Sequence, residues 1–208
     1  MRYVGMMLIL AAGVAGAQVR REPVALTAAP AVDVSVGGAL RNLASRAGVV
    51  FVGLVVAVER RGGVVEVRFS VQQVVQGAVG ATYTLREWAG LWAGGQQRYA
   101  VGQRAMWFLN APNGAGLNSP VDGMEGVVPL VPMGADAAPL PDVRRLATRI
   151  QRAVGQPMMV EAVALPEAVA SLATGKEPGV RELPGGWRPM PVKVQGQMRV
   201  LEEPHAAQ

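Results

Sequence analysis

The chain has 208 residues, of which 20 are basic and 15 acidic, with one histidine and no cysteine. Without cysteine it can form no disulfide framework, zinc ribbon, iron–sulfur cluster or thiolate nucleophile. The single histidine, His205, excludes a metal site built from several histidines. Half of the residues are hydrophobic, which is enough to bury a core. The formal charge of +5 comes almost entirely from arginine, and a compositional bias of the genome explains it as well as an anionic partner does.

The first 17 residues have the pattern of a secretory signal peptide. Arg2 precedes an uncharged stretch over residues 4–14, and small residues at Ala15 and Ala17 suit a signal peptidase. The apolar stretch is shorter than the roughly twenty residues that a membrane-spanning helix needs, although a retained anchor is the alternative. We therefore predict cleavage after residue 17 and an exported protein, periplasmic or secreted.

Residues 18–36 contain two prolines and no sustained period, so we interpret them as a linker. A domain over residues 37–133 follows, and it begins with a helix over residues 37–48. In that helix Leu40, Leu43 and Ala47 share one face.

The hydrophobic pattern then predicts five strands. The clearest is the second, where Val65, Val67, Phe69 and Val71 alternate with polar residues, so one face is buried. The apolar phase slips by one residue after Gln73, as a β-bulge would cause. Short strands with glycine-rich turns are typical of a small barrel or sandwich. The predicted strands cover residues 49–58, 65–75, 82–86, 104–109 and 126–131, with Trp107 of the fourth in the core.

The composition changes after residue 133. Residues 134–175 are predicted to be a helical extension, with helices over residues 141–154 and 165–174. The second of these helices has a proline in its first turn and Gly175 directly after its end. Residues 176–208 contain five prolines and little periodicity, which indicates a disordered tail or one that lies along the domain.

Four segments carry a resemblance to a known family: VVFVGLVVAVE, VEVRFSVQQVVQG, RYAVGQRAMWFLN and GLNSPVDGMEGVVPL. Through them, residues 47–131 resemble the tissue-inhibitor-of-metalloprotease/netrin-like OB-fold superfamily. The resemblance implies a mainly β protein: a five-stranded OB-like barrel, here preceded by a short helix and followed by two short helices and a proline-rich tail. Inhibitors of that family chelate the protease zinc through an amino-terminal cysteine, which this chain lacks. A shorter segment, ALRNLASRAGVVFV, is instead similar to the helix–strand units of secretin and receptor amino-terminal domains.

The candidate binding residues lie in the loop after the third predicted strand. Trp88 and Trp92 stand there, flanked by Arg86 and Arg98. Aromatic platforms beside arginine stack on sugar rings or bases, and OB barrels bind oligomers on a strand face and its rim loops. The alternative is that one or both tryptophans close the mouth of the barrel as core residues.

Catalytic candidates are few. Asp122 and Glu125 in SPVDGMEG can pair as a general acid and base, but a Pro-x-Asp-Gly sequence is first of all a turn. Ser119 has no histidine to activate it, and no phosphate-binding loop is present. We therefore predict no enzyme activity, no cofactor and no metal site.

Arginines on the helix over residues 141–154, from Arg144 to Arg152, lie away from its apolar stripe. They allow a weak contact with an anionic surface, and the alternative is an ordinary solvated face.

Three functional hypotheses follow from these patterns. The first is a non-catalytic interaction module that binds a protein or polymer partner outside the cytoplasm, with no specific nucleic acid expected. The second is a regulator or inhibitor of a co-secreted metalloprotease that acts through a loop surface. The third is a carboxylate-dependent hydrolase that uses Asp122 and Glu125.

Overall fold

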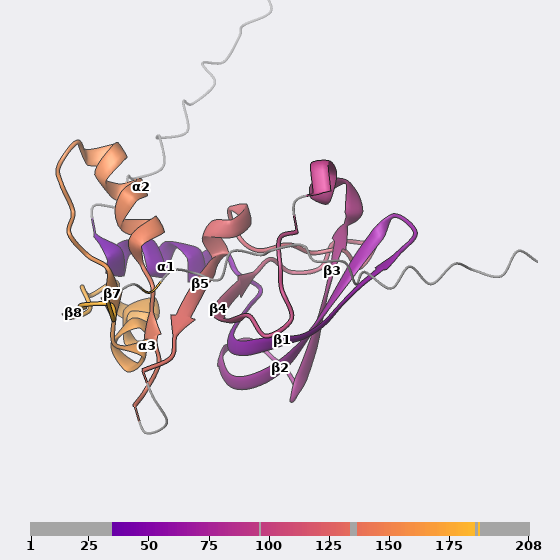
Figure 1. Cartoon of the computed structure of the whole chain (residues 1–208), viewed down its shortest axis with the longest axis horizontal. Helices are drawn as coiled ribbons and strands as arrows, with labels where there is room; N and C mark the ends of the chain where they lie inside the picture. Colours follow the sequence, from indigo (N-terminus) through magenta and orange to yellow (C-terminus); the bar gives the residue numbers. More distant parts are fainter. Residues whose placement is uncertain (1–34, 96, 134–136, 186, 188–208) are drawn as a thin grey trace, which may run out of the picture. The chain divides into compact units, whose positions relative to one another are not determined.

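The computed structural model describes residues 35–95, 97–133, 137–185 and 187 (Figure 1). The predicted signal peptide (residues 1–17), linker residues 18–34 and tail residues 188–208 lie outside the described residues. The predictions made for those segments therefore stay predictions.

Within the described residues the protein is mainly β, with a six-stranded antiparallel sheet in the order β3-β2-β1-β4-β5-β6 and three α-helices. All five predicted strands are present, and β6 is added. The outermost strands, β3 and β6, do not pair with each other, so the sheet is open and the predicted barrel is not confirmed. The strands are β1 (Val49–Arg61), β2 (Val64–Gln76), β3 (Thr82–Trp88), β4 (Arg104–Leu109), β5 (Val127–Val131) and β6 (Leu140–Pro141).

The long strands β1 and β2 bend through irregular register. Val52 pairs with Gln73 but Gly53 pairs with Val71, so Gln72 is an extra residue on β2. This bulge lies where the slip in the apolar phase predicted one, and such bulges raise the local twist of a strand. Gly53 is required there, because a Cβ would lie 2.9 Å from the ring of Phe51.

Two hydrophobic clusters lie on opposite faces of β1 and β4, because alternate side chains of a strand point to opposite sides. One cluster contains the predicted lining residues Val65, Val67, Phe69 and Trp107, all buried, with Val71 partly buried against them. The rings of Phe69 and Trp107 lie 4.7 Å apart, and the Trp107 indole donates to the Gly53 carbonyl at 3.0 Å. The prediction of this core is confirmed.

The second cluster joins the sheet to the three helices, α1 (Val36–Arg46), α2 (Arg144–Val154) and α3 (Leu165–Thr174). Figure 1 shows them gathered near β5. Helix α3 has the predicted bounds and ends at Gly175 with φ +68°. Helix α2 begins three residues later than predicted because Pro141 pairs with Leu130 and the Asp142 N–H donates to the Pro129 carbonyl.

The first residues of the predicted tail pack on the helices. Strand β8 (Val180–Arg181) pairs with β7 (Ala162–Val163), and the Glu177 carboxylate accepts from the N–H groups of Val36 and Gly37 at 3.2 and 2.8 Å. A Cβ at Gly37 would lie 2.2 Å from the Lys176 carbonyl oxygen, so this approach requires glycine. Among the described residues, no helix combines the length and the apolar character needed to cross a bilayer.

Candidate functional site

Strand β3 divides the candidate binding residues between two environments. Its side chains alternate, so Leu85 and Glu87 point into the core while Arg86 and Trp88 point outward. Trp88 is 61% exposed and Glu87 only 1% exposed. The 3₁₀ helix η1 (Ala89–Gly95) follows and contains Trp92, which is buried.

Glu87 is the centre of a buried polar cluster. Its carboxylate accepts from the Trp92 indole N–H at 3.0 Å and from the Tyr99 hydroxyl at 2.8 Å, and it pairs with Arg98 at 3.3 Å. Burial raises the pKa of Glu87, and the hydrogen bond from Tyr99, the charge of Arg98 and the Trp92 indole act in the opposite direction. Burial and the Glu87 charge also raise the pKa of Tyr99. The cluster ties residues 87, 92, 98 and 99 into one unit beneath β3.

The cluster contains two of the four residues predicted as a binding surface. Trp92 and Arg98 lie in it, so their polar groups face Glu87. The Nε of Arg98 is buried and has no hydrogen-bond partner within the described part of the chain. Glu87 and Tyr99 were not predicted as site residues, although the strand alternation placed Glu87 on the same face as Leu85.

The other two predicted residues, Arg86 and Trp88, lie on the outer face of β3. Arg86 pairs with Glu66 of β2 at 3.2 Å, and its backbone N–H and carbonyl bond to Asn118 at 3.1 and 2.8 Å. These backbone bonds cover the outer edge of β3. The indole ring of Trp88 lies against Gly90, where a Cβ would be 2.4 Å from ring atoms. The Trp88 ring therefore packs on Gly90 and is still exposed.

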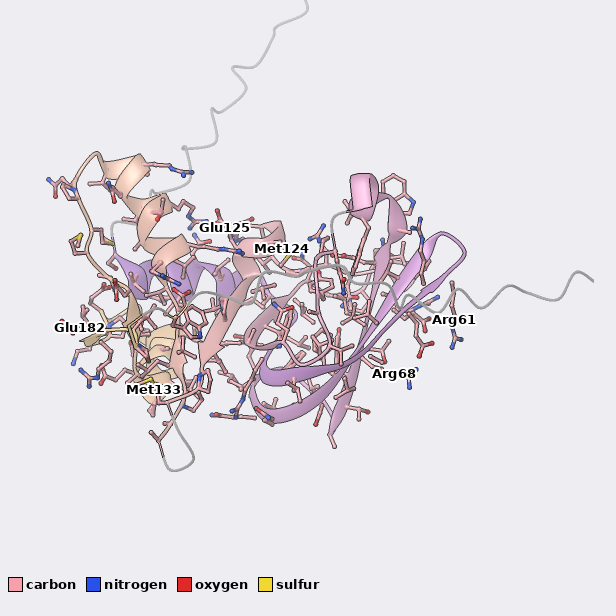
Figure 2. The ribbon with its side chains drawn as sticks, in the orientation of Figure 1. Arg61, Arg68, Met124, Glu125, Met133 and Glu182 are labelled. Atoms are coloured by element: carbon pink, nitrogen blue, oxygen red, sulfur yellow. The ribbon has the colours of Figure 1, made fainter. Side chains whose placement is uncertain are left out.

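Charged residues of both signs surround Trp88 on this face. Opposite Trp88 on β2 is Val64, which in turn pairs with Arg61 of β1. Arg61 and Arg68 both bind Glu59, the former at 2.8 Å, and Figure 2 shows the two arginines at the same end of the β1–β2 hairpin. The hydrogen bond from Arg61 holds the pKa of Glu59 below its usual value. We call the outer face of β1, β2 and β3 around Trp88 the Trp88 face; it consists of Glu59, Arg61, Val64, Glu66, Arg68, Arg86 and Trp88.

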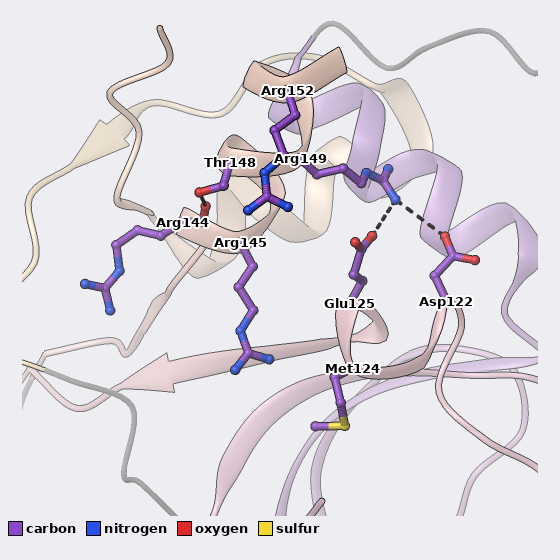
Figure 3. Close-up of a pocket in the computed structure, with 8 residues that line it drawn as sticks. All are labelled: Asp122, Met124, Glu125, Arg144, Arg145, Thr148, Arg149 and Arg152. Carbon is purple, nitrogen blue, oxygen red and sulfur yellow. Dashed lines mark hydrogen bonds and ion pairs between the residues drawn. The ribbon is translucent and has the colours of Figure 1, made fainter. Parts of the chain in front are cut away.

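A groove of about 380 Å³ lies on another part of the protein, between α2 and the 3₁₀ helix η2 (Gly123–Gly126) (Figure 3). We call it the arginine groove. Its lining consists of Asp122, Met124, Glu125, Arg144, Arg145, Thr148, Arg149 and Arg152.

The two carboxylates considered for catalysis both form ion pairs in this groove. Arg46 binds Asp122 through both terminal nitrogens, at 2.7 Å for the Nη1–Oδ1 pair, and Arg149 contacts both Asp122 and Glu125. The hydrogen bond from Arg46 lowers the pKa of Asp122, and the charges of Arg46 and Arg149 add to that effect against the cost of burial. The Pro-x-Asp-Gly segment forms the predicted turn, since the Gly123 N–H donates to the Pro120 carbonyl at 3.2 Å.

In comparisons with known proteins, no protein-family model matches the chain, and no match was found among curated proteins or among solved structures. Within the residues that the structure describes, no group of three or more His, Cys, Asp or Glu side chains is placed to hold a metal ion. The geometry of the two sites is therefore the basis for the functional argument.

Proposed function

We propose that the protein is an exported, non-catalytic binding module that holds a protein or polymer partner outside the cytoplasm through the Trp88 face. The observation that carries the proposal is Trp88 itself, a large aromatic side chain that is 61% exposed yet held against Gly90. Aromatic side chains with few rotatable bonds lose little entropy on binding and dominate the energetics of interfaces.

The support beneath Trp88 favours a recognition role. The Glu87 cluster, directly beneath the outer face of β3, includes three bonds to one carboxylate. Such support keeps an exposed contact residue in its binding geometry before the partner arrives, which lowers the entropic cost of association. In this proposal Trp92 and Arg98 position the surface, and Arg86 and Trp88 contact the partner.

We further propose that the sheet is an OB-like, partly open barrel. In an OB-fold the face of strands 2 and 3 binds oligosaccharides and oligonucleotides. Strand β1 pairs with both β2 and β4, and the Trp88 face lies on β2 and β3. A glycan is the polymer that best fits, because an indole stacks on a sugar ring while Arg86 and Glu66 offer a donor and an acceptor to its hydroxyls.

The test compares the full chain with its Trp88→Ala and Val101→Ala variants. Val101 is also 61% exposed but lies in the turn before β4, so it is a matched control. Calorimetric titration with soluble peptidoglycan fragments and envelope polysaccharides measures a polymer partner. We expect Trp88→Ala to weaken binding about tenfold or more, as loss of an aromatic stacking platform does, and Val101→Ala to leave it unchanged.

A protein partner is tested by placing a photoreactive amino acid at Leu91, which is exposed close to Trp88 in the chain. A cross-linked partner should disappear in the Trp88→Ala background and persist in the Val101→Ala background. The proposal is wrong if no polymer binds and no cross-link depends on Trp88.

A further inference from the structure

The arginine groove carries more positive charge than its own carboxylates neutralise. Four arginines and two carboxylates line it, so the lining has a net charge of +2. Outside the lining, Asp142 pairs with Arg144 at 2.9 Å, the charge of Glu161 also acts on Arg144, and Arg46 pairs with Asp122. The excess charge therefore belongs to the remaining arginines.

Arg145 and Arg152 are the source of that excess. Both are exposed, and no ion pair or hydrogen bond of either side chain occurs within the described part of the chain. Arg149, by contrast, binds both Glu125 and Asp122. The groove thus contains an ion-pair network and also two guanidinium groups that are exposed to solvent.

The spacing of these two arginines sets the size of a ligand. They are seven residues apart on α2, which corresponds to two turns and about 10 Å along the helix axis. In Figure 3 the Arg152 side chain runs back along α2 toward its amino-terminal end, and Arg145 leaves the same helix to line the groove. Residues seven positions apart on a helix lie on nearly the same face, so both side chains leave α2 on the side of the groove.

At the start of α2, the guanidinium group of Arg144 already has partners within the protein. The Arg144 guanidinium donates to Asp142 at 3.0 and 2.9 Å and lies 5.3 Å from the ring centre of Trp187. These contacts hold Arg144 on the side of the helix start and leave Arg145 and Arg152 as the groups that a ligand would meet.

We propose that the arginine groove binds a ligand with at least two phosphate groups, which Arg145 and Arg152 contact together. Guanidinium forks match the geometry of phosphate oxygens and bind them through paired charge-assisted hydrogen bonds. Because Asp122 and Glu125 also line the groove and repel anions, a ligand needs several charges close together to gain from the excess of +2. This site is separate from the Trp88 face and does not depend on the function proposed for that face.

The experiment measures binding of two probes to the full chain. Tripolyphosphate represents a free ligand, and vesicles of phosphatidylcholine with or without phosphatidylglycerol represent lipid headgroups. The variants are Arg145→Gln, Arg152→Gln and the control Arg60→Gln, which removes an exposed arginine from β1. All three side chains are exposed, so the unfolding midpoint of each variant should stay at the parental value.

We expect tripolyphosphate to bind more tightly than inorganic phosphate and to weaken about tenfold with either groove variant, a free energy of ~1.4 kcal/mol. Arg60→Gln should change binding less than about twofold, within the effect of a screened distant charge. Glu125→Gln should strengthen binding about threefold, because it raises the net charge of the lining to +3.

The source of the phosphate follows from which probe responds. Binding of tripolyphosphate that depends on Arg145 and Arg152 assigns a free ligand, whereas binding only to phosphatidylglycerol vesicles with the same dependence assigns a lipid surface. The proposal is overturned if neither probe binds, or if Arg60→Gln weakens binding as much as Arg145→Gln, since that would reflect net charge alone.

Discussion

Replacing Glu87 with glutamine preserves the shape of the side chain but leaves one acceptor oxygen where three donors converge. In the parent, Trp92 uses Oε2, while Tyr99 and Arg98 use Oε1. In Glu87→Gln the amide nitrogen must replace one of the two oxygens. Replacing Oε2 loses one hydrogen bond and replacing Oε1 loses two, so the nitrogen should lie opposite the Trp92 indole N–H. The variant therefore contains a buried donor without an acceptor.

The magnitude follows from two opposing effects. An unsatisfied buried donor costs ~1–3 kcal/mol, and Arg98, whose side chain is 16% exposed, loses its charged partner. Against these losses, the variant no longer has to bury a carboxylate, a cost that shows in the raised pKa of Glu87. We expect a net loss of ~2 kcal/mol for Glu87→Gln and ~3–5 kcal/mol for Glu87→Ala, which leaves all three donors without a partner.

A double-mutant cycle tests the assignment of the unsatisfied donor. Trp92→Phe removes the indole N–H, so the Glu87→Gln/Trp92→Phe variant should be ~1 kcal/mol more stable than the sum of the single changes predicts. Urea unfolding followed by circular dichroism gives the four free energies of unfolding. An additive cycle, or a loss below ~0.5 kcal/mol for Glu87→Gln, would refute the structural account of this cluster.

The same cluster fixes the sign of one pH effect. Because burial raises the pKa of Glu87 above its ordinary value of 4.5, the folded state binds this proton more strongly than the unfolded state. The contribution of Glu87 to the free energy of unfolding of the parent is therefore largest below pH 4.5, and it falls as the pH rises through the raised pKa. The cost of Glu87→Gln should accordingly be larger near pH 4.5 than at neutral pH.

Three further changes test other parts of the fold. The pKa of Asp122 lies below its usual value of 3.8, so the ionised carboxylate stabilises the folded state at pH values above 3.8. The cost of Asp122→Asn, measured by urea unfolding, should therefore shrink as the pH falls below 3.8. An equal cost at all pH values would contradict the ion pair with Arg46. Gly37→Ala forces a Cβ to within 2.2 Å of the Lys176 carbonyl, so it should expose residues 176–181 to proteolysis, while Gly63→Ala, with nothing within 4 Å, should not. Phe69→Ala should cost ~3–5 kcal/mol of unfolding free energy, and a cost near 1 kcal/mol would place this ring outside a tight core.

Local patterns predicted the elements well because their period reports directly on burial. The alternation from Val65 to Val71 gave the buried face of β2, and the proline in the first turn together with Gly175 after the last residue gave the bounds of α3. The bulge at Gln72 was visible as a slip in the same alternation. These signals arise within a few residues of one another, so a single sequence contains them.

Contacts between distant segments could not be predicted in this way. Glu87 meets Arg98 and Tyr99 across a loop, and Asp122 meets Arg46 across 76 residues, with no period to reveal either contact. Closure of the sheet also depends on whether its outermost strands reach each other, which local periodicity does not encode. For that reason the strands were predicted correctly, while the predicted OB-like barrel was not confirmed.

The contact between Glu177 and the start of α1 has a consequence for the order in which the chain folds. Two N–H groups of the first helix, those of Val36 and Gly37, donate to the Glu177 carboxylate, which lies 141 and 140 positions later. A chain that emerges from its amino-terminal end leaves these two N–H groups unpaired until nearly all of it is available. A fragment that ends before residue 177 should therefore have a first helix that frays at its start.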